Sequence, residues 1–227
     1  MRSCECRLQV NHQPPPLPCS KLTFCRLAPE DPFPAAVHDC WEAALWLYAA
    51  GSKLLNLDVN RFAIGGSSAG GNLTAVVCHK ALSSTNVPKF NVQLLIVPVT
   101  DNTATVENTA SWKSSEFVPA LPSEKMLWYR RHYLPDPTTW ELPESSPLFY
   151  RDGWEKQPSA LIVVGELDVL KDEGVAYGKK LTDAGVEVDL KIMAGMPHPF
   201  LAMDGALQQG RDAITYMVEA LKKSFGT

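Results

Sequence analysis

Short apolar runs along the chain predict the strands of a sheet. Three runs are short and mainly apolar, as is typical of strands buried on both faces, and a fourth alternates apolar with charged residues, which suits a half-exposed strand. In chain order the runs are Arg61 to Gly65, Val92 to Val97, Ser159 to Val164 and Val186 to Ile192.

Apolar residues at helical spacing separate these runs. They predict a helix that begins near Pro34 and is interrupted at Gly51, and further helices over Ala69 to Leu82, over Val175 to Ala184 and around Ile214 to Leu221. Strands that alternate with helices indicate an α/β fold, in which a mostly parallel sheet carries helices on both faces.

Two stretches depart from this alternation. Residues 1–24 contain three consecutive prolines and no apolar period, so we expect an irregular leader there, with at most a short strand at Lys21 to Cys25, ahead of one domain over residues 25–227. Residues 101–158 form an aromatic-rich insertion. Above the carboxyl edge of a parallel sheet, such an insertion is expected to act as a cap-like lid or pocket wall, and additional core is the alternative.

Composition narrows the class of partner. Of 227 residues, 45% are apolar and 20% are charged, which is ordinary for a globular protein, and the net charge is −4. A mildly acidic chain lacks the positive field on which nucleic-acid binding depends. Its apolar runs are too short to cross a bilayer. We therefore expect neither a nucleic-acid partner nor a membrane span.

The cysteines indicate a reducing compartment. Four of the six lie in the first 25 residues, and the spacing of Cys4 and Cys6 is too tight for paired zinc ligands. No secretory signal is visible near Met1. We expect reduced thiols, a cytoplasmic location, and no metal or cofactor.

The pattern G-x-S-x-G occurs at Gly66-Ser67-Ser68-Ala69-Gly70, between a predicted strand and a predicted helix. This is the context of a nucleophile elbow, a turn so sharp that its flanking positions tolerate no side chain while the serine projects above the sheet. Ser68 is the predicted nucleophile, and Ser67 should face away. The alternative is a glycine-rich turn without chemistry.

An activated serine needs a histidine base and a carboxylate that orients it, in the chain order Ser, Asp or Glu, His. Asp168 and His198 each follow a predicted strand, so both belong at the carboxyl edge of the sheet with Ser68. We expect Asp168 to contact the ring of His198. Glu166 and Asp172 are the alternative carboxylates.

Four segments in this order resemble the signatures of the hormone-sensitive-lipase-type branch of the α/β-hydrolase family. They are Arg26-Leu27-Ala28-Pro29-Glu30, Gly66-Ser67-Ser68-Ala69-Gly70-Gly71-Asn72-Leu73, Asp168-Val169-Leu170-Lys171-Asp172-Glu173-Gly174 and Gly195-Met196-Pro197-His198-Pro199-Phe200. The resemblance begins near Cys25 and implies the α/β-hydrolase fold. It implies a serine carboxylester hydrolase with Ser68, His198 and Asp168 as its triad, and the aromatic insertion favours short to medium acyl esters as substrates.

The resemblance also shows what residues 1–24 lack. That branch carries a His-Gly-Gly-Gly run upstream of the Arg26 segment, and the N–H groups of this run form most of the oxyanion hole. No such run precedes Arg26, so residues 1–24 look like unrelated sequence joined to an N-terminally truncated core, as a gene-model or splicing product would give. The Ala69 N–H then remains as the oxyanion donor, and loss of one donor typically costs about 10²–10³ in turnover.

Two functions therefore stay open at this point. The first is an active esterase, and the second is a catalytically impaired homologue or a non-catalytic ligand-binding derivative. Missing strands would also leave an open sheet edge that invites association with a second copy, so a homo-oligomer is compatible with the sequence. No substrate-binding residues are assigned.

Overall fold

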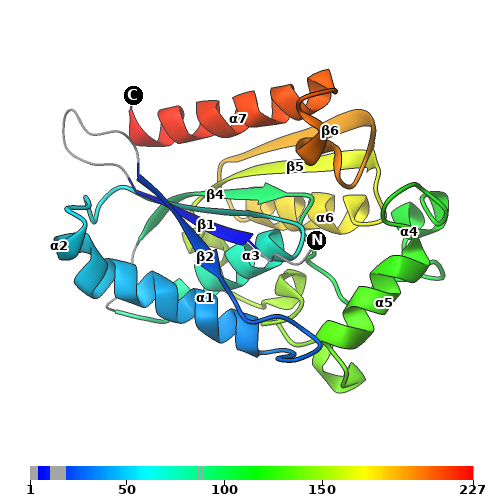
Figure 1. Ribbon diagram of the computed structural model, residues 1–227, viewed down its shortest axis with the longest axis horizontal. Helices are drawn as coiled ribbons and strands as arrows, with labels where there is room; N and C mark the ends of the chain where they lie inside the picture. Colours follow the sequence, from blue (N-terminus) through cyan, green and yellow to red (C-terminus); the bar gives the residue numbers. More distant parts are fainter. Residues whose placement is uncertain (1–4, 11–18, 86, 88, 227) are drawn as a thin grey trace.

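The computed structural model describes residues 5–10, 19–85, 87 and 89–226 (Figure 1). Its sheet has the strand order β2-β1-β3-β4-β5-β6, with β3 to β6 parallel and β1 antiparallel to both of its neighbours. The strands are β1 (Glu5–Val10), β2 (Cys19–Phe24), β3 (Phe62–Ser67), β4 (Phe90–Ile96), β5 (Ser159–Leu167) and β6 (Val188–Pro197).

Helices cover both faces of this sheet. Figure 1 shows α7 along one face and α1, α3 and α6 along the other. The α-helices are α1 (Ala35–Trp46), α2 (Ser52–Leu54), α3 (Ala69–Leu82), α4 (Ala110–Ser114), α5 (Ser123–Tyr133), α6 (Lys171–Asp183) and α7 (Gln208–Phe225). The expected α/β architecture is therefore confirmed. None of the described helices is both long and apolar enough to cross a membrane.

Strand β5 illustrates how one short run serves two cores. Leu161 and Val163 pack in the cluster that includes Ala213 of α7, whereas Ile162 and Val164 pack with Tyr177 of α6. Successive side chains of a strand point to opposite faces, so a strand covered on both sides must be apolar at every position. The continuous apolar run in the sequence has this origin.

Two helices differ from the expected pattern. The first does not break at Gly51, because α1 continues as a π-helical segment over Leu47–Gly51 and then as α2. In α7, Ile214 and Val218 are 40% and 43% exposed. Of the apolar residues expected along this helix, Met217 and Leu221 do pack in the core cluster, together with Ala213.

The prediction of an irregular leader is wrong for residues 5–10, which form a strand, whereas the strand at Cys19–Phe24 overlaps most of the short strand expected at Lys21 to Cys25. These residues form β1 and β2, and β1 pairs with β3 in the register Cys6 to Gly66 and Val10 to Phe62. Unpaired N–H and C=O groups along the edge of β3 favour such pairing. The sequence does contain a signal, since apolar residues alternate with polar ones from Cys4 to Val10. Residues 1–4 and 11–18 lie outside the described part of the chain.

The aromatic insertion contributes to the core and also to the surface. Trp112 of α4 is completely buried and packs in one cluster with Val169 and Leu170, whereas Phe117 is 87% exposed. Figure 1 shows α4 and α5 at one end of the sheet, beyond the carboxyl end of β4. The insertion therefore supports the segment that follows β5, and it leaves aromatic surface free at the same end.

Candidate active site

Ser68 occupies a strained turn between β3 and α3. Its φ of 57° and ψ of −115° lie in a region that non-glycine residues seldom adopt, and such strain is concentrated at functional sites. A Cβ on Gly66 would lie 2.3 Å from the backbone carbon and oxygen of Gly70, so this position has no room for a side chain. The turn has the geometry expected of an elbow, and Ser67 is exposed beside it.

The structure brings Ser68, Asp168 and His198 into one hydrogen-bonded row. His198 Nε2 lies 2.8 Å from the Ser68 hydroxyl oxygen, and His198 Nδ1 lies 2.7 Å from Oδ2 of Asp168. Each residue directly follows a strand, namely β3, β5 or β6. These strands are parallel, so their carboxyl ends share one edge of the sheet, and residues that are far apart in sequence meet there.

The protonation pattern of this row follows from the acceptors. The carboxylate of Asp168 is fully buried, where it accepts hydrogen bonds from the Leu170 N–H at 3.0 Å and from His198. An ionised carboxylate only accepts, so the neutral imidazole carries its proton on Nδ1. Nε2 is then free to accept the proton of the Ser68 hydroxyl, which is the arrangement that makes a serine nucleophilic.

The two alternative carboxylates make other contacts. Glu166 Oε2 accepts a hydrogen bond from the Gly195 N–H at 2.7 Å, and Asp172 Oδ2 accepts one from the Ser111 N–H at 2.7 Å. Asp168 is thus the carboxylate that contacts His198, as expected. Asp172 lies in the first turn of α6, where the positive end of the helix dipole favours a carboxylate.

A buried carboxyl group beside the site was not singled out from the sequence. Glu173 is almost fully buried, and its Oε1 accepts hydrogen bonds from the backbone N–H groups of Thr100 at 2.7 Å and Asp101 at 3.1 Å. Burial raises the pKa of Glu173 to about 8, although these hydrogen bonds and the Arg130 guanidinium act in the opposite direction. Glu173 joins α6 to the loop after β4. The sequence feature that could have pointed to Glu173 is its place in the segment Asp172-Glu173-Gly174.

The backbone N–H of Ala69 is the oxyanion donor expected from the sequence. Ala69 is exposed and is the first residue of α3, so its N–H group points out of the helix end where the macrodipole is positive. A glycine-rich second donor segment is absent from residues 1–24, which contain no glycine.

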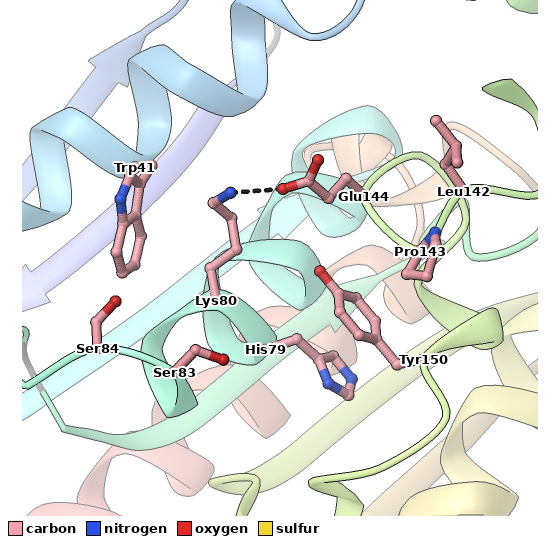
Figure 2. Close-up of a pocket in the computed structure, with 9 residues that line it drawn as sticks. All are labelled: Trp41, His79, Lys80, Ser83, Ser84, Leu142, Pro143, Glu144 and Tyr150. Carbon is pink, nitrogen blue, oxygen red and sulfur yellow. Dashed lines mark hydrogen bonds and ion pairs between the residues drawn. The ribbon is translucent and has the colours of Figure 1, made fainter.

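A cavity of about 510 Å³ lies between α1, the end of α3 and the loop before β5, away from Ser68 (Figure 2). Figure 2 shows Trp41 and Tyr150 on opposite sides of the cavity, with Lys80 between them. The Nζ atom of Lys80 lies 2.5 Å from Oε1 of Glu144. His79 stacks against Tyr150 with ring centroids 3.9 Å apart. The cavity contains no residue of the Ser68 row.

A second cavity, of about 540 Å³, lies beside Trp154 and Lys180 and also contains no residue of the Ser68 row. Neither cavity therefore locates the substrate of a reaction at Ser68. In the described part of the chain, no cluster of three or more His, Cys, Asp or Glu side chains could hold a metal ion.

Comparisons with known proteins agree with the fold. A family model described as alpha/beta hydrolase fold matches residues 25–202. An AB hydrolase superfamily protein of Schizosaccharomyces pombe is 52% identical over 188 residues, which cover 82% of this chain and 55% of the relative. Ethyl acetate hydrolase of Pseudomonas putida is 31% identical, over 87% of this chain and 61% of the relative.

Solved structures give the same result. EstE1, a thermostable carboxylesterase cloned from a metagenomic library, is similar with a TM-score of 0.82 and 33% identity, over 91% of this chain and 69% of that one. The chain spans only 55% and 61% of the length of the two curated relatives named above.

Proposed function

Since the chain belongs to the α/β-hydrolase family, in its hormone-sensitive-lipase-type branch, we propose that it is a serine carboxylester hydrolase. The observation that carries the proposal is the position of the His198 ring, with one nitrogen on the hydroxyl of Ser68 and the other on the buried carboxylate of Asp168. A base between a serine and an orienting acid is the arrangement that acyl transfer requires.

The proposed reaction has two halves. The Ser68 oxygen attacks the acyl carbon while His198 Nε2 accepts its proton, and the Ala69 N–H donates to the oxyanion. His198 then gives the proton to the leaving alkoxide, which departs as an alcohol and leaves an acyl-serine. A water molecule, deprotonated by the same nitrogen, hydrolyses this ester and restores Ser68. Asp168 keeps the proton on Nδ1 and stabilises the imidazolium in both halves.

Short to medium acyl esters are the proposed substrates. One curated relative is named an ethyl acetate hydrolase, which supports the short end of this range. The exposed aromatic residues of the insertion, among them Phe117 and Trp128, provide apolar surface at the same end of the sheet, and we propose that residues 101–158 form the wall of the acyl site. A cytoplasmic location remains a prediction from the sequence.

The second candidate is a catalytically impaired member of the family. The observation that favours it is the leader, which contains no glycine and supplies β1, a strand antiparallel to β3. With the Ala69 N–H as the assigned oxyanion donor, a correctly arranged Ser68 would react slowly.

Hydrolysis and active-site labelling together distinguish the two candidates. The purified chain is assayed with aryl esters of increasing acyl length, and it is treated with a fluorophosphonate whose adduct is located by mass spectrometry. An active esterase hydrolyses the shorter esters and carries the adduct on Ser68, and Ser68→Ala abolishes both signals while the control Ser67→Ala retains them. Labelling of Ser68 without turnover would favour the impaired homologue. An adduct that survives Ser68→Ala would refute the assignment of the nucleophile.

A further inference from the structure

The pairing of β5 with β6 changes register just before Asp168 and His198. Gly165 of β5 faces Met193 of β6, but Leu167 faces Pro197. Between these pairs β5 has one residue, Glu166, while β6 has three, residues 194–196. The extra residues form a β-bulge, here called the β6 bulge, in which several residues of one strand oppose one residue of its partner.

The β6 bulge determines which residue reaches Asp168. Continuing the register of the Leu167 and Pro197 pair by one residue places Asp168 opposite His198, and these two side chains are hydrogen-bonded at 2.7 Å. Continuing the earlier register from Gly165 and Met193 would have placed Asp168 opposite Met196. The offset of the bulge is therefore what aligns the histidine with the carboxylate.

Three features support the β6 bulge. Gly195 has φ of +70°, a conformation that glycine adopts without strain. The bulge packs closely on β5, since a Cβ on Gly165 would lie 2.4 Å from the Met196 oxygen. The carboxylate of Glu166 accepts a hydrogen bond from the Gly195 N–H at 2.7 Å, and a charged acceptor makes this bond stronger than a neutral one.

We propose that Glu166 is a positioning residue, which holds the β6 bulge in the offset that places His198 between Asp168 and Ser68. The inference rests on the proposed function for its kinetic consequences. Glu166 touches neither the serine nor the imidazole in any described contact, so it acts through Gly195. Its side chain is exposed, which makes the fold tolerant of its replacement.

The kinetic test compares three variants with the wild-type chain. Glu166→Ala should lower kcat about tenfold with KM nearly unchanged, because the histidine loses its precise position while the surface that binds substrate stays. Glu166→Gln should restore most of kcat, since the amide oxygen still accepts from Gly195. Asp189→Ala is the matched control. It also removes an exposed carboxylate, but Asp189 lies on β6 outside the bulge, where it pairs with Lys191.

The second readout does not require turnover. The proton that His198 Nδ1 shares with Asp168 gives a far-downfield proton NMR resonance when the two groups are held together. It should weaken or shift upfield in Glu166→Ala and persist in Glu166→Gln and Asp189→Ala. If the wild-type chain shows this resonance but no ester turnover, the proposed esterase activity is refuted, while the effect of Glu166→Ala on the resonance still tests the positioning role of Glu166. Unchanged kcat and an unchanged resonance in Glu166→Ala would overturn the positioning role.

Discussion

The elbow glycine Gly66 permits a sharp test of how precisely Ser68 must be held. In Gly66→Ala the new methyl group would begin 2.3 Å from the backbone carbon and oxygen of Gly70. Carbon atoms in ordinary contact lie at about 3.5 Å, so the two sides of the turn must separate by roughly 1 Å. Both contacts are with backbone, and no side-chain rotation relieves them. Ser68 lies between the two glycines, and its hydroxyl is only 2.8 Å from His198 Nε2.

A displacement of this size should cost at least about 10²-fold in reactivity, or about 2.7 kcal/mol of transition-state stabilisation. The assay is the rate at which a fluorophosphonate labels Ser68, because labelling reports on the serine and its base even when ester turnover is slow. The control Gly205→Ala adds the same methyl group where no atom lies within 4 Å, and it should label at the wild-type rate. Thermal unfolding verifies that both variants fold. A folded Gly66→Ala that labels at the wild-type rate would refute the reasoning.

Three further predictions concern stability and the leader. Burial lowers the pKa of His79 to about 3 from an ordinary 6.5, so between these pH values the unfolded chain binds a proton that the native chain does not. The free energy of unfolding should therefore fall as the pH falls through this window, by up to about 1.4 kcal/mol per pH unit. Urea titrations of His79→Phe should show a weaker dependence of the free energy of unfolding on pH. The raised pKa of Glu173, about 8 against an ordinary 4.5, has the opposite effect, because in this range the native chain keeps a proton that the unfolded chain releases. The free energy of unfolding should therefore fall as the pH rises from 4.5 towards 8, and it should depend less on pH in Glu173→Gln. Replacing residues 1–24 with a family segment that carries the glycine run should raise kcat/KM at least about 10²-fold, and equal, high activity in both chains would show that other groups hold the oxyanion.

Several elements were predictable because their signals are local. The bounds of α3, residues 69–82, agree with the sequence prediction, since a glycine-rich turn precedes the helix and its apolar residues continue to Leu82. The elbow could be located for the same reason, because the lack of space at Gly66 is a property of the turn itself. Asp168 and His198 were predictable as residues that directly follow strands.

Other elements depended on the neighbours that the fold supplies. The alternation from Cys4 to Val10 favours a strand, but only the pairing with β3 gives that strand its place in the sheet. Helical spacing in α7 marked Ile214, Met217, Val218 and Leu221 alike as apolar, but only Met217 and Leu221 pack with Ala213 in the core, because the side of the helix that meets the sheet is set by packing.

The sequence by itself determined the α/β alternation, the elbow at Ser68 and the short set of carboxylates that could serve His198. The sequence favoured Asp168 among those carboxylates, and only the tertiary structure brings it into contact with His198. Asp168 was expected from its place after a strand and from the resemblance to the family, but Glu166 and Asp172 lie in the same seven-residue stretch, and the contact itself is made with a residue on another strand. The contact comes from the register between β5 and β6, which backbone hydrogen bonds and the three-residue β6 bulge opposite Glu166 establish between segments distant in the sequence.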